Sequence, residues 1–116
     1  MQTVFHVSSP DADVRRHALV NVNNLLEDDT VTSAADDVAI VANGAAVRMF
    51  VDGVAEHEPL VASLLAREVD CFACSASLER VDATAEGLLS GVEPVESGVG
   101  ALASLQDDGY GYVKAP

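Results

Sequence analysis

The sequence predicts an α/β fold, a three-layer α/β/α sandwich built on a mostly parallel five-stranded sheet. Short apolar or β-branched segments alternate with segments of helical periodicity along the whole chain. Segment 38–42 is continuously apolar, as expected of a strand that helices cover on both faces. The chain has 116 residues, and this length predicts one domain over residues 1–116.

The first elements are a strand and a long helix. Residues 3–7 are β-branched or aromatic and predict a strand. The helix is expected to start with Ser9 as its N-cap and Pro10 at its first position. Apolar residues then recur at helical spacing over 14–26, and the polar segment 28–37 predicts a loop.

The middle of the chain predicts a buried strand and a second helix. The strand at 38–42 ends in Asn43-Gly44, and 45–51 predicts a short helical turn. Pro59 lies where the next helix would begin. The expected buried face of that helix is Leu60, Val61, Leu64 and Leu65.

The last part of the chain predicts three more strands. They are expected at 69–74, 92–95 and 110–113, the last of them at a sheet edge. Between them, 75–77 predicts a helix cap, 84–89 a short helix, and 97–105 a helix that ends at 107–109.

The charge is strongly negative. Six Lys and Arg stand against 19 Asp and Glu, a net charge of −13. Such a field repels phosphate and anionic lipid, so we expect neither nucleic acid nor a membrane surface as a partner. Lys114 is the single Lys, Ile40 the single Ile, and Val and Ala abound. This pattern is typical of a protein from a salt-loaded cytoplasm and predicts lost stability at low salt.

The sequence predicts neither a membrane span nor a signal peptide. No segment approaches the ~18 consecutive apolar residues of a membrane span. Residues 1–3 lack the charged start of a signal peptide, and two cysteines are too few for a disulfide scaffold. We therefore expect a cytoplasmic protein.

Cys71 and Cys74 form a C-x-x-C spacing with three interpretations. A redox dithiol is disfavoured, because three residues of strand separate the two Cα atoms by about 10 Å. A disulfide needs them below about 7 Å. A zinc site lacks ligands, because His6, His17 and His57 are scattered without metal-binding spacing.

The third interpretation separates the two cysteines. Cys71 lies inside the expected strand and is best read as a small buried hydrophobe. Cys74 falls at the carboxyl end of that strand, where open α/β sheets place their sites, just before the amides of 75–77. An anionic sulfur there would gain hydrogen bonds, so Cys74 is the candidate reactive thiol. Ordinary core filler is the alternative.

Other candidates surround the same edge of the sheet. Asn43-Gly44 is either a plain turn or a pocket wall, and 97–100 resembles a fragment of an anion-binding loop. The latter lacks the full pattern of a phosphate or dinucleotide loop. A serine hydrolase is excluded by the lack of a G-x-S-x-G motif. His6 is expected to be a satisfied core histidine, and a general base is the alternative.

Several stretches in order resemble the DsrE/DsrF-like family of small sulfur-relay proteins. The stretches lie across almost the whole chain. They are Val4-Phe5-His6-Val7, 18–26, 41–47, 69–78, 95–102 and 109–113. The resemblance implies a Rossmann-like five-stranded sandwich that assembles into homotrimers or homohexamers. With the acidic composition, it suggests a halophilic archaeal source.

In that family the sulfur is carried as a persulfide on a Cys at a strand end, and Cys74 matches this position. Relatives commonly read Cys-x-Asn-Thr-Leu there, whereas this chain has Ala76 and Ser77 in place of Asn and Thr. Asn43 stands where relatives commonly have His. The departures remove proton and hydrogen-bond partners near the thiol.

The sequence therefore predicts a sulfur-relay protein that takes sulfur from a persulfide donor protein and gives it to a thiol acceptor protein. Cys74 is the expected catalytic residue, with no metal and no organic cofactor. The expected substrate-binding residues are Asn43, Gly44, Ser75, Ser77, Ser97, Gly98 and Gly100. The alternative is a non-catalytic oligomeric module that binds a small ligand or a partner at the same edge.

Overall fold

A single parallel sheet organises the computed structural model, which describes residues 1–33 and 35–116. Its strand order is β4-β3-β2-β1-β5, and every neighbouring pair is parallel. The strands are β1 (Gln2–Val7), β2 (Asp37–Ala42), β3 (Asp70–Cys74), β4 (Glu93–Val95) and β5 (Gly111–Lys114). The predicted α/β fold with five strands is confirmed, and β5 lies at an edge as expected.

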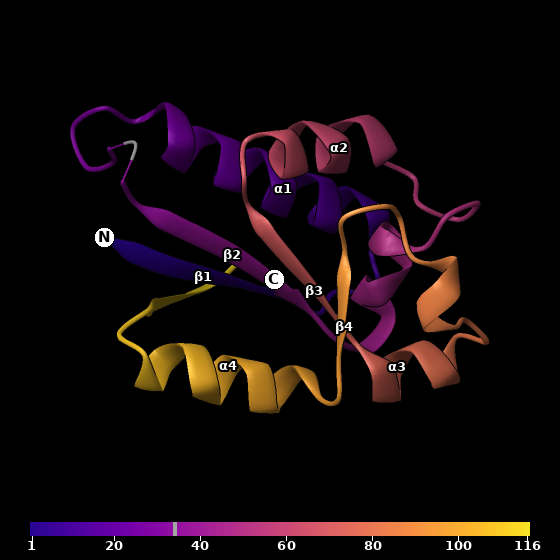
Figure 1. Ribbon diagram of the computed structural model, residues 1–116. Helices are drawn as coiled ribbons and strands as arrows, with labels where there is room; N and C mark the ends of the chain where they lie inside the picture. Colours follow the sequence, from indigo (N-terminus) through magenta and orange to yellow (C-terminus); the bar gives the residue numbers. More distant parts are fainter. Residues whose placement is uncertain (34) are drawn as a thin grey trace.

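Helices cover both faces of the sheet. Figure 1 shows α1 (Ala12–Glu27) and α2 (Glu58–Ala66) on one side of the sheet and α4 (Gly98–Asp107) on the other. Three shorter elements connect the strands: the 3₁₀ helix η1 (Gly44–Phe50), α3 (Ser75–Arg80) and the 3₁₀ turn η2 (Ala85–Gly87). Because all strands are parallel, their carboxyl ends meet at one edge, where η1, α3 and α4 begin.

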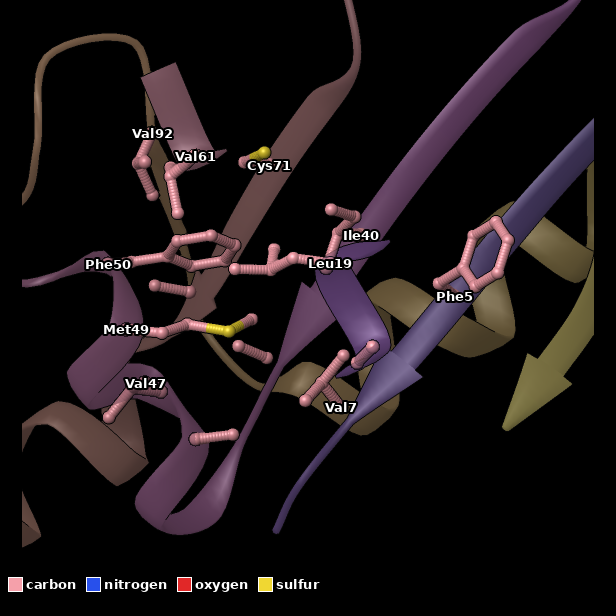
Figure 2. Close-up of a cluster of buried hydrophobic side chains, with 14 of the residues drawn as sticks. Phe5, Val7, Leu19, Ile40, Val47, Met49, Phe50, Val61, Cys71 and Val92 are labelled. Carbon is pink, nitrogen blue, oxygen red and sulfur yellow. The ribbon is translucent and has the colours of Figure 1, made fainter. Parts of the chain in front are cut away.

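The core is mainly aliphatic and divided by the sheet. On the side of α1 and α2, Phe50 lies among aliphatic side chains and Met49 (Figure 2). On the side of α4 a smaller cluster joins Val4, Ala39, Val41 and Leu102. Alternate residues of β1 and β2 therefore face different layers, and His6 lies on the α4 side by the same alternation.

The start of α1 differs from the prediction. The N-cap is Asp11, not Ser9, and the helix begins at Ala12 rather than at Pro10. The Asp11 carboxylate accepts hydrogen bonds from the backbone N–H groups of Asp13 and Val14. The hydroxyl of Ser9 instead accepts from the Asp11 N–H at 3.1 Å. Ser and Asp are both favourable N-cap residues, and here the Asp11 carboxylate is the one that binds the first-turn N–H groups.

The helix predicted at 84–89 is wrong. Only η2 forms there, because the end of the segment is held in an extended form. The Leu89 N–H donates to the Phe50 carbonyl at 2.8 Å, and Leu88 pairs with Val51 in an antiparallel bridge. The helical residues lie earlier, in α3, where the predicted cap 75–77 forms the first turn.

The remaining elements agree with the sequence pattern. Ser97 caps α4, η1 replaces the predicted helical turn, and Pro59 lies in the first turn of α2. The loop predicted at 28–37 joins α1 to β2, and its residue 34 lies outside the described residues. None of the helices in the described part of the chain is long and apolar enough to cross a membrane.

Candidate functional site

Cys74 lies at the carboxyl edge of the sheet, as the last residue of β3 and the N-cap of α3. Its backbone is still extended there (φ −67°, ψ 116°), so the chain turns into the helix just after the thiol. The residue is 5% exposed. The thiol therefore lies at the boundary between the core and the strand-end surface.

Four donor groups surround the sulfur of Cys74 and lower its pKa. They are the hydroxyl of Ser77 and the backbone N–H groups of Gly98, Ser77 and Ala76. Burial raises the pKa of Cys74, but these donors together outweigh burial, and the pKa lies below its ordinary value. Donors that stabilise the anion favour the thiolate, which is the nucleophilic form.

The Ser77 hydroxyl is oriented by the turn after β2. It accepts a hydrogen bond from the Gly44 N–H at 2.7 Å. Since a hydroxyl has one proton to donate, the bond from Gly44 leaves that proton free for the sulfur of Cys74. Gly44 has φ +59°, a left-handed conformation that glycine adopts without strain, and this conformation presents its N–H to Ser77.

Gly98 closes the site from α4. A Cβ at this position would lie 2.9 Å from the Cβ of Asn43 and 3.4 Å from the Cβ of Cys74. Only glycine allows the start of α4 to come this close to both strand ends. The Ser97 hydroxyl caps α4 by accepting from the Gly100 N–H at 3.0 Å. Ser97 and Gly100 thus build the helix start that delivers the Gly98 amide to the sulfur.

Cys71 has the opposite environment. It is 1% exposed, and its thiol donates to the Val69 carbonyl at 3.9 Å. Burial raises its pKa to about 12, with a further contribution from the Asp70 carboxylate. Both cysteines are free. The C-x-x-C spacing therefore contains one thiol with a raised pKa and one with a lowered pKa.

A polar chain lies beside the thiol on the α4 side of the sheet. The Nε2 of half-buried His6 is 2.7 Å from the Oδ1 of Asn43, and its Nδ1 is 2.6 Å from the hydroxyl of Tyr112. Burial is the main reason that the pKa of His6 is lowered; the Asn43 bond raises it and the charge of Lys114 lowers it. Sequence reasoning treated His6 as a core residue and did not single out Tyr112.

The site residues predicted from the sequence separate into two groups. The structure brings Asn43, Gly44, Cys74, Ser77 and Gly98 together at the carboxyl edge. The other three serve the helices: Ser97 and Gly100 form the cap of α4, and Ser75 begins α3, where the amides of the next two residues reach the sulfur. These three residues build the helix starts beside the site, and their predicted contact with a substrate stays a prediction.

The histidine, cysteine and acidic side chains of the described residues are dispersed. Across residues 1–33 and 35–116, no group of three or more His, Cys, Asp or Glu side chains is placed to hold a metal ion. His57 contacts the Ala12 carbonyl at 3.0 Å, and His17 is exposed on α1.

A polar hollow at the opposite edge of the sheet is separate from the site at Cys74. It lies near the start of β2 and the end of α2, where its walls include Thr32, Asp36 and Arg67. It contains no cysteine, and it is lined by residues from the amino end of β2, away from the strand end that carries the thiol.

The fold and the cysteine define a small α/β protein with a thiol of lowered pKa at the carboxyl edge of a parallel sheet. The chain belongs to the DsrE/DsrF-like family, whose model matches residues 2–115, and this family is generally related to sulfur relay.

Two solved structures are similar over nearly the full chain. A protein of unknown function, MTH1491 from Methanobacterium thermoautotrophicum, shares 28% sequence identity with a TM-score of 0.87, covering 97% of both chains. The ychN protein from E. coli shares 16% identity with a TM-score of 0.79, covering 98% of this chain and 99% of its own, and it supports the fold alone. A search of curated proteins found no match.

Proposed function

We propose that this protein is a sulfur carrier that holds persulfide sulfur on Cys74. The observation that supports it most is the set of donors around one sulfur: the Ser77 hydroxyl and the amides of Ala76, Ser77 and Gly98. The same chain keeps its other thiol, Cys71, buried and protonated. Because the family is generally related to sulfur relay, we expect sulfane sulfur to be the group that Cys74 carries.

The transfer consists of two exchanges without net oxidation. The Cys74 thiolate attacks the outer sulfur of a donor persulfide, R–S–SH. A new S–S bond forms on Cys74, the S–S bond of the donor breaks, and the donor leaves as a thiolate that keeps the electron pair. An acceptor thiolate then attacks the outer sulfur of Cys74–S–SH. This attack regenerates the Cys74 thiolate and makes the acceptor persulfide.

The donors have a defined part in both exchanges. In the resting protein they favour the thiolate that starts the first exchange. In the second exchange Cys74 is the leaving group, and the same donors stabilise the charge that returns to its sulfur. Low thiol basicity therefore assists release as well as loading.

Donor and acceptor are expected to be proteins, and the carrier itself is proposed to be a homotrimer or homohexamer. Edge strand β5 supports assembly, because Tyr112 and Val113 are 44% and 41% exposed. Another subunit would cover this edge. Light scattering in molar KCl tests the assembly, and a monomeric mass would contradict it.

A second candidate is a non-catalytic module that binds a small ligand or a partner at the same edge. Asn43 favours it, since its carboxamide oxygen is bonded to His6 and an amide cannot accept the thiol proton as a base would. Ala76 also offers no side-chain donor. In this case the thiol cradle, which is the set of donors from Ala76, Ser77 and Gly98 around Cys74, would remain as a feature of the fold.

Intact mass spectrometry after incubation with glutathione persulfide in molar KCl separates the two candidates. The carrier is expected to gain one sulfur atom in the wild type and in Cys71→Ala, but not in Cys74→Ala. Cys71→Ala is the matched control, because it removes the inert thiol three residues away. Sulfur on Cys71, or no gain in the wild type, would contradict the carrier.

A further inference from the structure

The hydrogen-bond directions around His6 follow from the chemistry of its partners. The Oδ1 of Asn43 can only accept, so the Nε2 of His6 must carry the proton that joins them at 2.7 Å. In neutral imidazole the other nitrogen is then an acceptor. The Tyr112 hydroxyl, 2.6 Å from Nδ1, must therefore donate. Lowering of the His6 pKa, by burial first, agrees with the neutral form.

The hydrogen bonds from Tyr112 to His6 and from His6 to Asn43 determine which way the Asn43 carboxamide faces. Strand β2 lies between β1 and β3 in the sheet, and Asn43 directly follows β2. Its oxygen is turned toward His6 of β1. The NH₂ group, on the other side of the same planar amide, is turned away from β1.

Asn43 and Cys74 meet at Gly98. Both side chains lie within contact distance of a Cβ built on that glycine, at 2.9 Å for Asn43 and 3.4 Å for Cys74. The donors that lower the pKa of Cys74 come from Ser77, Ala76 and Gly98. The Asn43 amide is thus beside the thiol and is not one of the donors that lower its pKa.

A persulfide places a second sulfur about 2 Å beyond the first. That outer sulfur carries charge when ionised and needs donors of its own, because the four donors of the cradle are directed at the inner sulfur. We propose that His6 and Tyr112 are positioning residues that hold the Asn43 carboxamide so that its NH₂ group donates to the outer sulfur of the Cys74 persulfide. The inference rests on the proposed carrier function.

Protonation of His6 would not reverse the arrangement at Asn43, because Nε2 remains a donor. The groups that face His6 are Asn43 from the end of β2 and Tyr112 and Lys114 from β5, and Lys114 is the charged one among them. Loss of the imidazole donor would release the amide, which could then present its oxygen to the outer sulfur and repel it.

The test compares two rates in each variant. One is the loading of sulfur from glutathione persulfide, followed by intact mass. The other is the alkylation of free Cys74 by iodoacetamide as a function of pH, which reports the thiol pKa. The variants are His6→Phe, His6→Gln and Tyr112→Phe. The matched controls are His17→Gln, at an exposed position of α1, and Tyr110→Phe, at the residue just before β5.

His6→Phe removes the donor to Asn43 and is expected to slow loading about tenfold. Tyr112→Phe is expected to slow it about threefold, since the hydroxyl acts one bond further away. His6→Gln retains an N–H donor and is expected to restore most of the rate. The pH profile of alkylation should be unchanged in all three, because the inner sulfur keeps its donors.

Each other outcome has a defined meaning. A wild type that does not load overturns the carrier function, and this inference with it. A wild type that loads while His6→Phe and Tyr112→Phe load equally fast overturns the positioning role alone. An alkylation profile that moves to higher pH together with slower loading would assign these residues to the thiol itself and overturn the outer-sulfur role.

Discussion

The Gly44 N–H donates to the Ser77 hydroxyl at 2.7 Å, and this bond connects the turn after β2 to the thiol at the end of β3. Ser77 is 9% exposed, so its hydroxyl has little access to water as an alternative partner. Accepting from Gly44 while donating to Cys74 satisfies the hydroxyl on both sides. The lowered pKa of Cys74 thus depends on the end of a neighbouring strand.

Ser77→Ala is expected to raise the pKa of Cys74. The substitution removes a hydrogen bond to a charged group, which contributes about 1.5 kcal/mol and corresponds to about tenfold in the thiolate population. Alkylation by iodoacetamide at pH 7 should slow by that factor, and the pH profile should move upward. Ser75→Ala, in the same turn, is the control, and an equal effect there would contradict the role of Ser77.

Gly98→Ala is expected to destabilise the protein and to weaken the cradle. A methyl group at 2.9 Å from the Cβ of Asn43 must push the start of α4 away from the strand ends. Overpacking of this kind costs about 1–3 kcal/mol. Urea unfolding measures the loss, and alkylation of Cys74 should slow because the Gly98 amide moves.

Gly87→Ala provides the comparison, because a Cβ there would meet its nearest atom only at 3.8 Å. Since alanine favours helices over glycine, a stabilised Gly98→Ala protein would show that the close approach is relieved at no cost.

The layered α/β fold and the strand end that carries Cys74 were accessible to sequence reasoning for clear physical reasons. Continuous apolar character over 38–42 identified a strand covered on both faces. The position of Cys74 at a strand end followed from where the β-branched and apolar run stops. Short-range patterns carry this kind of information well.

Contacts between distant segments were not accessible. His6 and Tyr112 are 106 residues apart, and they meet only because β5 pairs with β1 across the sheet. The donor from Gly98 likewise depends on how the chain returns through β4 to α4. The other two wrong predictions have local causes. Asp11 caps α1 in place of Ser9, and the hydrogen bond from the Leu89 N–H to the Phe50 carbonyl replaces a helical bond.

Histidine protonation is expected to make stability depend on pH. Burial lowers the pKa of His6 in the folded protein below its unfolded value of about 6.5. As the pH falls through 6.5, the unfolded chain therefore binds the proton first. Stability is lost between pH 6.5 and the folded pKa, and no such loss occurs above pH 6.5.

Urea unfolding at pH 7.5 and pH 5.5 checks this dependence. The wild type should lose more stability between the two values than His6→Gln, while exposed His17→Gln should behave as the wild type. Equal losses in the wild type and His6→Gln would show that His6 is not the responsible group.

Low salt is expected to destabilise the protein through the amino edge of the sheet. Asp37, Asp70 and Glu93 begin three neighbouring parallel strands, so their carboxylates share one edge. Burial raises the pKa of Asp70, and the charges of Glu93 and Asp37 raise it further. Screening extends over about 10 Å at 0.1 M salt but about 3 Å at 1 M, so this repulsion grows on dilution. The melting temperature should fall from molar to millimolar KCl, and it should fall less in Asp70→Asn than in Asp52→Asn. A melting temperature independent of KCl would contradict the repulsion, and equal falls in the two variants would place it away from this edge.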